Sequence, residues 1–163
     1  MKPLTRILVM VNLIALLGYT IFYVQAKETI LSDGELLLFE LAPVDPRSLI
    51  QGDYMALNYA VSDGLSRDSL PKTGFFVVTK NADGVAQRER IQPSTTPLSP
   101  GEFLVNYTMP GWQMNIGAEA YFFEEGTGPV YEVAKYGGLK IDNAGNSLLV
   151  GLYDEDRLLL GEE

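Results

Sequence analysis

An uncharged apolar run near the N-terminus constrains this chain more than any other feature. Residues 7–26 contain no Asp, Glu, Lys or Arg, and most of them are Leu, Ile, Val, Ala or aromatic. As an α-helix, this run of twenty residues is about 30 Å long, which matches the hydrocarbon layer of a bilayer. The run predicts a transmembrane anchor and leaves residues 27–163 to form one domain of ordinary size.

Charges on the N-terminal side of the run predict its orientation. Lys2 and Arg6 precede the run, and no acidic residue occurs before Glu28. Cationic flanks stay on the cytoplasmic side of a membrane, so residues 1–6 are expected inside the cell and the domain outside the membrane. Three aromatic residues fall where the outer interface would lie: Tyr19, Phe22 and Tyr23.

A cleaved signal peptide is the alternative to a permanent anchor. Val24, Gln25 and Ala26 provide small residues at the positions that a signal peptidase reads. Against cleavage, the apolar run is longer than the 7 to 15 residues that are usual in a signal peptide. Both interpretations export the domain, and they differ only in whether it stays tethered.

The chain contains no Cys and no His. It therefore cannot form a disulfide, a thiol nucleophile, a zinc-thiolate site, a His ligand or a His general base. We expect no cofactor and no metal site. Residues 27–163 carry 10 Lys plus Arg and 21 Asp plus Glu, a net charge of 10 minus 21, or −11. This charge repels phosphate backbones, so nucleic-acid binding is not expected.

Short alternating segments separated by turn residues predict a mainly β fold. We expect a small antiparallel barrel or sandwich with seven or eight strands and one short helix. The helix is predicted over residues 129–135, with Val130, Val133 and Ala134 on one apolar stripe. Residues 32–34 are predicted as a turn. The strands are predicted over residues 35–41, 53–61, 75–80, 85–91, 102–109, 118–123, 139–142 and 147–153, with a further short edge strand over 158–160.

The octet Gly52-Asp53-Tyr54-Met55-Ala56-Leu57-Asn58-Tyr59 joins a turn to one of these strands. Its period of two places Met55, Leu57 and Tyr59 on a buried face. Asp53 lies at the hinge. Its carboxylate either serves as a ligand or acid/base group, or it accepts backbone amides at the turn.

Gly52-Asp53-Tyr54-x-x-Leu57-x-Tyr59 resembles the octet after which the GDYXXLXY family is named. Further similarity follows downstream, in Glu125-Gly126-x-Gly128, Glu132, Tyr136-Gly137 and Gly145. The resemblance implies a bacterial inner-membrane protein of unassigned function, with an exported domain on one membrane helix. It also implies a multi-pass membrane protein as partner, because members tend to be encoded beside such proteins or fused to them.

A second, local similarity is to signal peptidase I. Pro46-x-x-Leu49-x-x-Gly52-Asp53-Tyr54 resembles a segment of those enzymes, in which a nucleophilic Ser stands two residues before the Pro. Val44 occupies that position here. Protease activity is therefore not expected.

Two other segments provide candidate binding residues. Trp112, the only Trp, lies in the apolar loop 109–117, which either contacts a partner or folds back onto the core. Glu124, Glu125 and Glu132 form the densest carboxylate group, beside glycines that let a ligand approach the backbone. Such carboxylates serve glycoside hydrolysis or Ca²⁺ binding, but Glu132 can equally bond into the turn before its own helix.

We expect a non-enzymatic, membrane-anchored extracytoplasmic domain that binds or assists another envelope or membrane protein. The candidate binding residues are Asp53, Trp112, Glu125 and Glu132. The alternative is a hydrolase that acts on envelope glycans through Asp53, Glu125 or Glu132.

Overall fold

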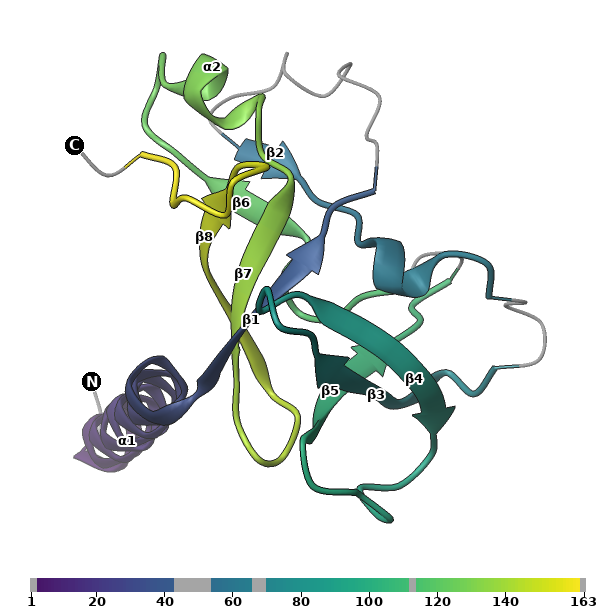
Figure 1. The fold of residues 1–163 in the computed structure, drawn as a ribbon. Coiled ribbons are helices and arrows are strands. Elements are labelled where there is room, and N and C mark those ends of the chain that lie inside the picture. Colours follow the sequence, from purple (N-terminus) through teal and green to yellow (C-terminus); the bar gives the residue numbers. More distant parts are fainter. Residues whose placement is uncertain (1–2, 43–53, 66–69, 112–113, 162–163) are drawn as a thin grey trace.

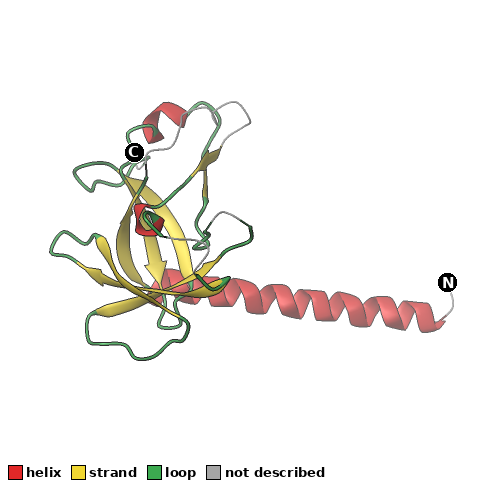
Figure 2. Ribbon diagram, turned by 90° about the vertical axis from the view of Figure 1, so that its right-hand side faces the viewer, coloured by secondary structure: helices red, strands yellow, loops and turns green. Residues whose placement is uncertain are grey.

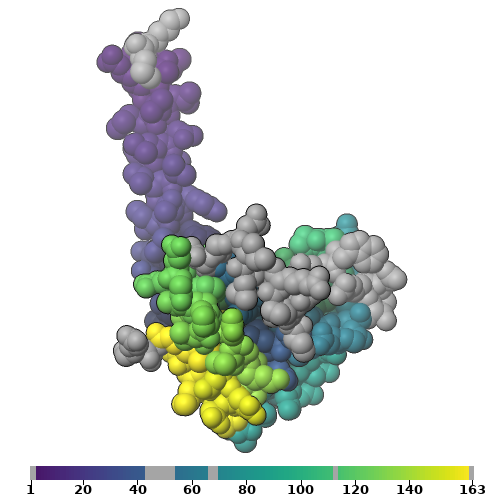
Figure 3. Space-filling model, turned by 90° about the horizontal axis from the view of Figure 1, so that it is seen from above, coloured from purple at the N-terminus to yellow at the C-terminus, as the bar shows by residue number. Residues whose placement is uncertain are grey.

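A computed structural model describes residues 3–42, 54–65, 70–111 and 114–161. One long N-terminal helix projects from a domain of short strands, as Figure 2 shows. The predicted mainly β class is confirmed. In the space-filling view most of the helix extends away from the domain as a purple column (Figure 3).

Three small antiparallel sheets make up the described part of the domain (Figure 1). They are connected by short contacts, such as the bridge between Leu38 and Val85, and these strands do not close into a barrel. The first sheet has the order β1 (Glu35–Glu40), β7 (Tyr136–Ile141), β8 (Ser147–Tyr153). The second has the order β4 (Ala86–Gln92), β3 (Thr73–Lys80), β5 (Glu102–Thr108). The third pairs β2 (Tyr54–Ala56) with β6 (Ala120–Phe122). Two short helical turns complete these elements: η2 (Ala60–Ser62) and α2 (Gly128–Tyr131).

One hydrophobic core joins the three sheets. The middle of β3 is fully buried on both faces, because Phe76, Val77 and Val78 have no exposed surface. Burial of this kind supplies most of the free energy that favours folding. The main core cluster consists of Leu37, Phe39, Leu57, Tyr59, Phe76, Val78, Val105, Tyr107, Ile116, Ala118, Tyr131, Leu139, Ile141 and Leu152.

Two hairpins join consecutive antiparallel strands, β3 to β4 and β7 to β8. In the turn between β3 and β4, the Asn81 side-chain oxygen accepts the Val85 amide at 2.9 Å. In the turn between β7 and β8, Asp142 Oδ1 accepts the Asn146 amide at 2.8 Å. Such side chains close a turn because they replace a missing backbone acceptor. The expected C-terminal edge segment is present as a bridge between Tyr153 and Leu159.

The N-terminal helix α1 (Pro3–Asp33) extends beyond the apolar run into the domain. The turn predicted over residues 32–34 is wrong, because the helix continues to Asp33 and the Gly34 amide bonds to the Ile30 carbonyl at 3.0 Å. Packing explains the extension. Ile30 is only 5% exposed, and Lys140 donates a hydrogen bond to the Leu31 carbonyl. The domain therefore supports the last turns of α1.

Two other predicted elements are shorter than expected. The strand predicted over residues 53–61 ends at Ala56. The Leu57 amide then bonds to Glu119, and the Asn58 carbonyl accepts the Ala42 amide, so the chain passes from β6 toward the end of β1. The helix predicted over residues 129–135 ends at Tyr131. Of the three residues expected on its apolar stripe, Ala134 packs against the core, whereas Val130 and Val133 are 44% and 63% exposed.

Candidate functional site

Two residues of the octet are anchored deep in the core. Leu57 is 2% exposed and Tyr59 is 4% exposed. The Tyr59 hydroxyl donates to the Ala118 carbonyl at 2.7 Å, and its ring meets Phe39 edge-on at 6.2 Å. Burial, and next the negative charge of Glu119, raise the pKa of Tyr59. The hydroxyl therefore stays neutral and serves as a structural donor.

The octet also holds a turn that sequence reasoning did not single out. The Leu57 amide donates to the Glu119 carbonyl at 2.8 Å, directly after the Ala118 carbonyl that Tyr59 contacts. The Glu119 side chain folds back, and its Oε1 accepts the amides of Ile116 and Gly117. A carboxylate two residues after a glycine in an irregular segment is a possible signal for such a turn.

The β2–β6 ribbon leaves part of the octet at the surface. Tyr54 pairs with Phe122 across the two strands, with ring centroids 5.8 Å apart. The two residues are 37% and 75% exposed. Ala56 pairs with Ala120 on the same face, because side chains two residues apart on a strand point the same way. We call these four residues, Tyr54, Ala56, Ala120 and Phe122, the outer face of the ribbon.

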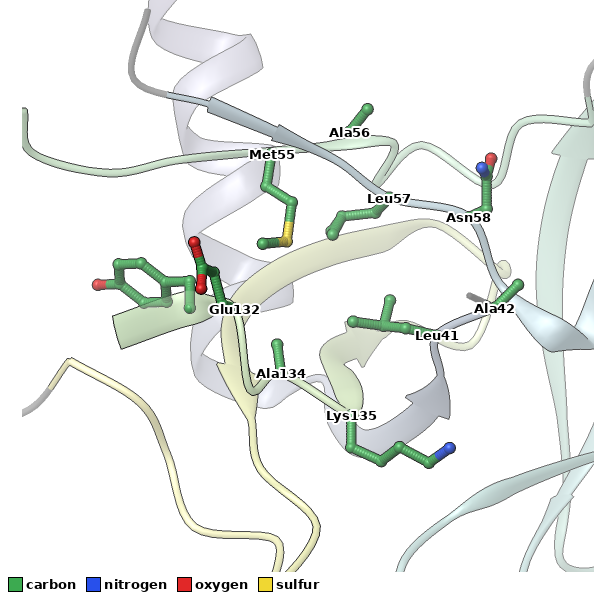
Figure 4. Close-up of a pocket in the computed structure, with 10 residues that line it drawn as sticks. Leu41, Ala42, Met55, Ala56, Leu57, Asn58, Glu132, Ala134 and Lys135 are labelled. Atoms are coloured by element: carbon green, nitrogen blue, oxygen red, sulfur yellow. The ribbon is translucent and has the colours of Figure 1, made fainter. Parts of the chain in front are cut away.

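The inner side of the octet borders a cavity of about 260 Å³, which we call the octet cavity. Met55 and Leu57 point into it, whereas Ala56 points away (Figure 4). Glu132 extends toward Met55, and Lys135 is directed elsewhere and pairs with Glu40 at 2.9 Å. The lining residues are Leu41, Ala42, Met55, Ala56, Leu57, Asn58, Tyr131, Glu132, Ala134 and Lys135.

The expected interaction of Glu132 is not the one observed. Glu132 follows α2 as its C-terminal cap residue, and its exposed side chain lies beside the octet rather than in the turn before the helix. The reason is that α2 ends one residue earlier, at Tyr131, whose ring packs against Phe123 at 5.2 Å. The fold thus brings Glu132 and the octet together, which their separation in the sequence did not reveal.

The other candidate residues have different outcomes. Glu125 is exposed in the turn between β6 and α2, and it does not line the octet cavity. Gly52, Asp53 and Trp112 lie outside the described residues. Within the described part of the chain, no cluster of three or more Asp and Glu side chains is placed to hold a metal ion.

A family model described as GDYXXLXY protein matches residues 16–152 of the chain. The chain belongs to the GDYXXLXY family. No curated protein and no solved structure matches it. The local likeness to signal peptidase I therefore has no support from these comparisons.

The described positions of the GDYXXLXY motif fall into two groups. Leu57 and Tyr59 are explained by folding, because they fill the core and hold the Glu119 turn. Tyr54 is different, since its ring remains at the surface on the outer face of the ribbon. Of the described motif residues, Tyr54 is thus the one placed to contact another molecule.

The octet cavity itself offers a limited chemistry. Among its described lining residues Glu132 is the only carboxylate, whereas glycoside hydrolysis ordinarily uses two that face each other across the bond to be cleaved. Most of the remaining lining is apolar or amide. A site of this composition suits the binding of an apolar side chain with a basic or amide neighbour.

Proposed function

We propose that this protein is a non-enzymatic, single-pass inner-membrane protein with an extracytoplasmic domain that binds another membrane-spanning protein. Its N-terminus is cytoplasmic, and α1 is retained as an anchor. The outer face of the ribbon is the contact surface. The observation that carries the proposal is the exposed Tyr54–Phe122 pair, which is built partly from a family motif residue.

The anchor is supported by the surface of α1. The helix is long and apolar enough to cross a bilayer, and its large apolar side chains are exposed, as for Leu4 at 76% and Phe22 at 72%. An exposed apolar surface of this length requires a lipid or protein environment. Lys2 and Arg6 precede it, and they favour a cytoplasmic N-terminus.

The junction between anchor and domain supports a function at the membrane surface. Ile30 is buried in the domain, and the first residue of β1 is only two positions after the end of α1. No flexible linker separates the two. The domain is therefore held beside the bilayer, where partners in the same membrane reach a high effective concentration.

The outer face of the ribbon has the composition of a contact surface. It contains two aromatic rings and two alanines, without a charged side chain. Aromatic residues are enriched in protein interfaces, and charged residues are depleted at their centres. The face is smaller than a standard interface of about 800 Å² per partner. Confinement of both proteins to one membrane compensates for the small area.

Site-specific photocrosslinking in membranes tests the proposal. A photoreactive phenylalanine analogue replaces Phe122 in one variant and Leu98 in the other. Leu98 is also exposed, at 42%, but it lies in the connection between β4 and β5 at the bottom of Figure 1. We expect an adduct with a membrane-spanning protein at position 122, none at position 98, and a weaker adduct when Tyr54→Ser is added.

Several results would overturn the proposal. The first is the absence of adducts at position 122, and the second is adducts formed only between copies of this chain. A third is hydrolysis of envelope glycans by the purified protein that is lost in Glu132→Gln and retained in Tyr54→Ser. That pattern would identify the protein as a hydrolase that acts through the octet cavity.

A further inference from the structure

A second cavity lies where α1 leaves the apolar run, and its lining is mostly polar. Its volume is about 320 Å³, and we call it the polar cavity. Lys27, the first residue after the apolar run, contributes to its wall. Three other segments form the opposite walls. They contribute Asn106 from β5, Asn115 and Glu119 from the segment before β6, and Ser147 from the start of β8.

Opposite charges line this cavity, one on the helix and one on the domain. Lys27 forms no ion pair within the described residues, and its ammonium group is free to bind an anion. Glu119 is held in place because Oε1 accepts the Ile116 and Gly117 amides, the second at 2.8 Å. No bond from a described residue reaches its other oxygen, Oε2. The cavity therefore offers one cationic and one anionic group for a ligand.

The second oxygen of Glu119 determines the chemistry that a ligand needs on that side of the cavity. A carboxylate oxygen accepts hydrogen bonds, so a ligand for this cavity should supply N–H or O–H groups on the side that faces Glu119.

The level of the cavity relative to the bilayer identifies the ligand class, if α1 is the transmembrane anchor that we proposed above. Lys27 then lies at the outer end of a span of about 30 Å, at the level of the lipid headgroups. A headgroup phosphate is the anion nearest to such a lysine. A primary ammonium supplies both N–H donors and a positive charge for Glu119 Oε2.

We infer that the polar cavity binds the headgroup of a zwitterionic phospholipid with a primary ammonium, of the phosphatidylethanolamine type. Lys27 binds its phosphate, and Glu119 accepts hydrogen bonds from its ammonium. Choline headgroups lack the N–H donors, and glycerol headgroups lack the cation. The net charge of −11 on residues 27–163, 10 cationic against 21 acidic residues, further disfavours an anionic lipid.

The experiment compares lipids that differ only in the headgroup. The full-length protein is reconstituted in nanodiscs of phosphatidylcholine that contain either phosphatidylethanolamine or phosphatidylglycerol. Lipids that remain bound after release from the nanodiscs are counted by native mass spectrometry. We expect one retained phosphatidylethanolamine per chain. Glu119→Gln should reduce its retention about tenfold because a charge-assisted hydrogen bond is lost, while the glutamine oxygen still accepts the two amides of the turn.

Matched variants provide the controls. Lys27→Gln should weaken retention of phosphatidylethanolamine, whereas Lys72→Gln and Glu125→Gln, which change exposed residues outside the polar cavity, should have no effect. Equal retention of ethanolamine and choline lipids would overturn the inference, as would a preference for phosphatidylglycerol. Equal effects of Glu119→Gln and Glu125→Gln would do the same. If Glu119→Gln does not fold, the comparison of lipids in the unchanged chain and the Lys27→Gln variant still test the inference.

Failure of this inference can be separated from failure of the proposed function. Extraction of native membranes at alkaline pH shows whether α1 anchors the chain, independently of any bound lipid. A chain that stays in the membrane but shows no preference for ethanolamine lipids disproves the headgroup site alone. The Phe122 crosslink tests the partner surface separately, because that residue does not line the polar cavity.

Discussion

At the scale of single residues, the octet combines structural roles with a surface role. Tyr59 links the core to the Glu119 turn through its bond to Ala118, and Leu57 fixes the same turn through its backbone amide. Tyr54 places its ring at the surface instead. Substitutions at these positions should therefore affect different properties: stability for Leu57 and Tyr59, and partner binding for Tyr54.

Tyr59→Phe tests the structural role of the hydroxyl. We expect the free energy of unfolding to fall by about 1 kcal/mol at pH 7, because a buried hydrogen bond is lost. The pKa of Tyr59 is raised in the folded protein, so above pH 10, the ordinary pKa of tyrosine at 10.0, only the unfolded chain loses this proton. Loss of this proton then favours unfolding of the unchanged protein. The difference in the free energy of unfolding between the unchanged protein and Tyr59→Phe should therefore shrink.

Urea unfolding from pH 7 to above pH 10 measures both effects. Tyr54→Phe is the control, since the Tyr54 ring lies at the surface, and we expect its stability to match the unchanged chain at pH 7. An advantage over Tyr59→Phe that grows with rising pH would contradict the assigned sign.

At the scale of elements, the junction between α1 and β1 is the most constrained connection. The Gly34 amide closes the last helical turn on the Ile30 carbonyl, and the chain enters β1 at the next residue. A side chain at position 34 has no room, because a Cβ atom there would lie 2.4 Å from the Ile30 oxygen. Because the atoms around position 34 are closely packed, they have little room to move aside for a side chain.

Gly34→Ala should therefore destabilise the full-length chain, by about 1–3 kcal/mol, which is typical of overpacking. Gly18→Ala is the matched control within the same helix, because no atom lies within 4 Å of a Cβ placed there. Unfolding of both variants in the same detergent micelles provides the comparison. Equal stabilities would show that the junction tolerates a displaced backbone.

At the scale of the whole molecule, the arrangement of α1 and the domain decides which surfaces can meet a partner. The mostly apolar helix α1 projects from the domain (Figure 2), and residues 27–163 carry 21 acidic residues and 10 basic ones. The proposed topology places the polar cavity at the bilayer surface and gives the outer face of the ribbon access to neighbouring membrane proteins.

Cysteine labelling tests this topology without interference, because the natural chain has no cysteine. Leu158→Cys, at an exposed position of the domain, should react with a membrane-impermeant maleimide in intact spheroplasts. Leu4→Cys, exposed near the start of α1, should react only after the membrane is permeabilised. Labelling in the opposite order would reverse the proposed orientation. Loss of residues 1–26 from the mature protein, detected by its mass, would replace the anchor with a signal peptide.

Much of the fold could be predicted from local patterns. The apolar run, the hairpin turns at Asn81 and Asp142, and the buried positions Leu57 and Tyr59 all follow from composition and periodicity. Alternation of apolar and polar side chains, however, indicates which residues are buried. It does not indicate which residues form backbone hydrogen bonds with a neighbouring strand. For this reason the octet strand was predicted too long, although its inward-facing residues were correct.

The sequence by itself determined the membrane-length helix, the mainly β class, the family and the buried face of the octet, because each depends on neighbouring residues. Tertiary structure alone decided that Glu132 borders the octet, that Glu119 is held beneath it, and that α1 continues into the domain. These features depend on contacts between residues far apart in the chain, such as Lys140 with Leu31. Local periodicity does not indicate such contacts, because they form only when elements that are distant in the sequence pack against one another.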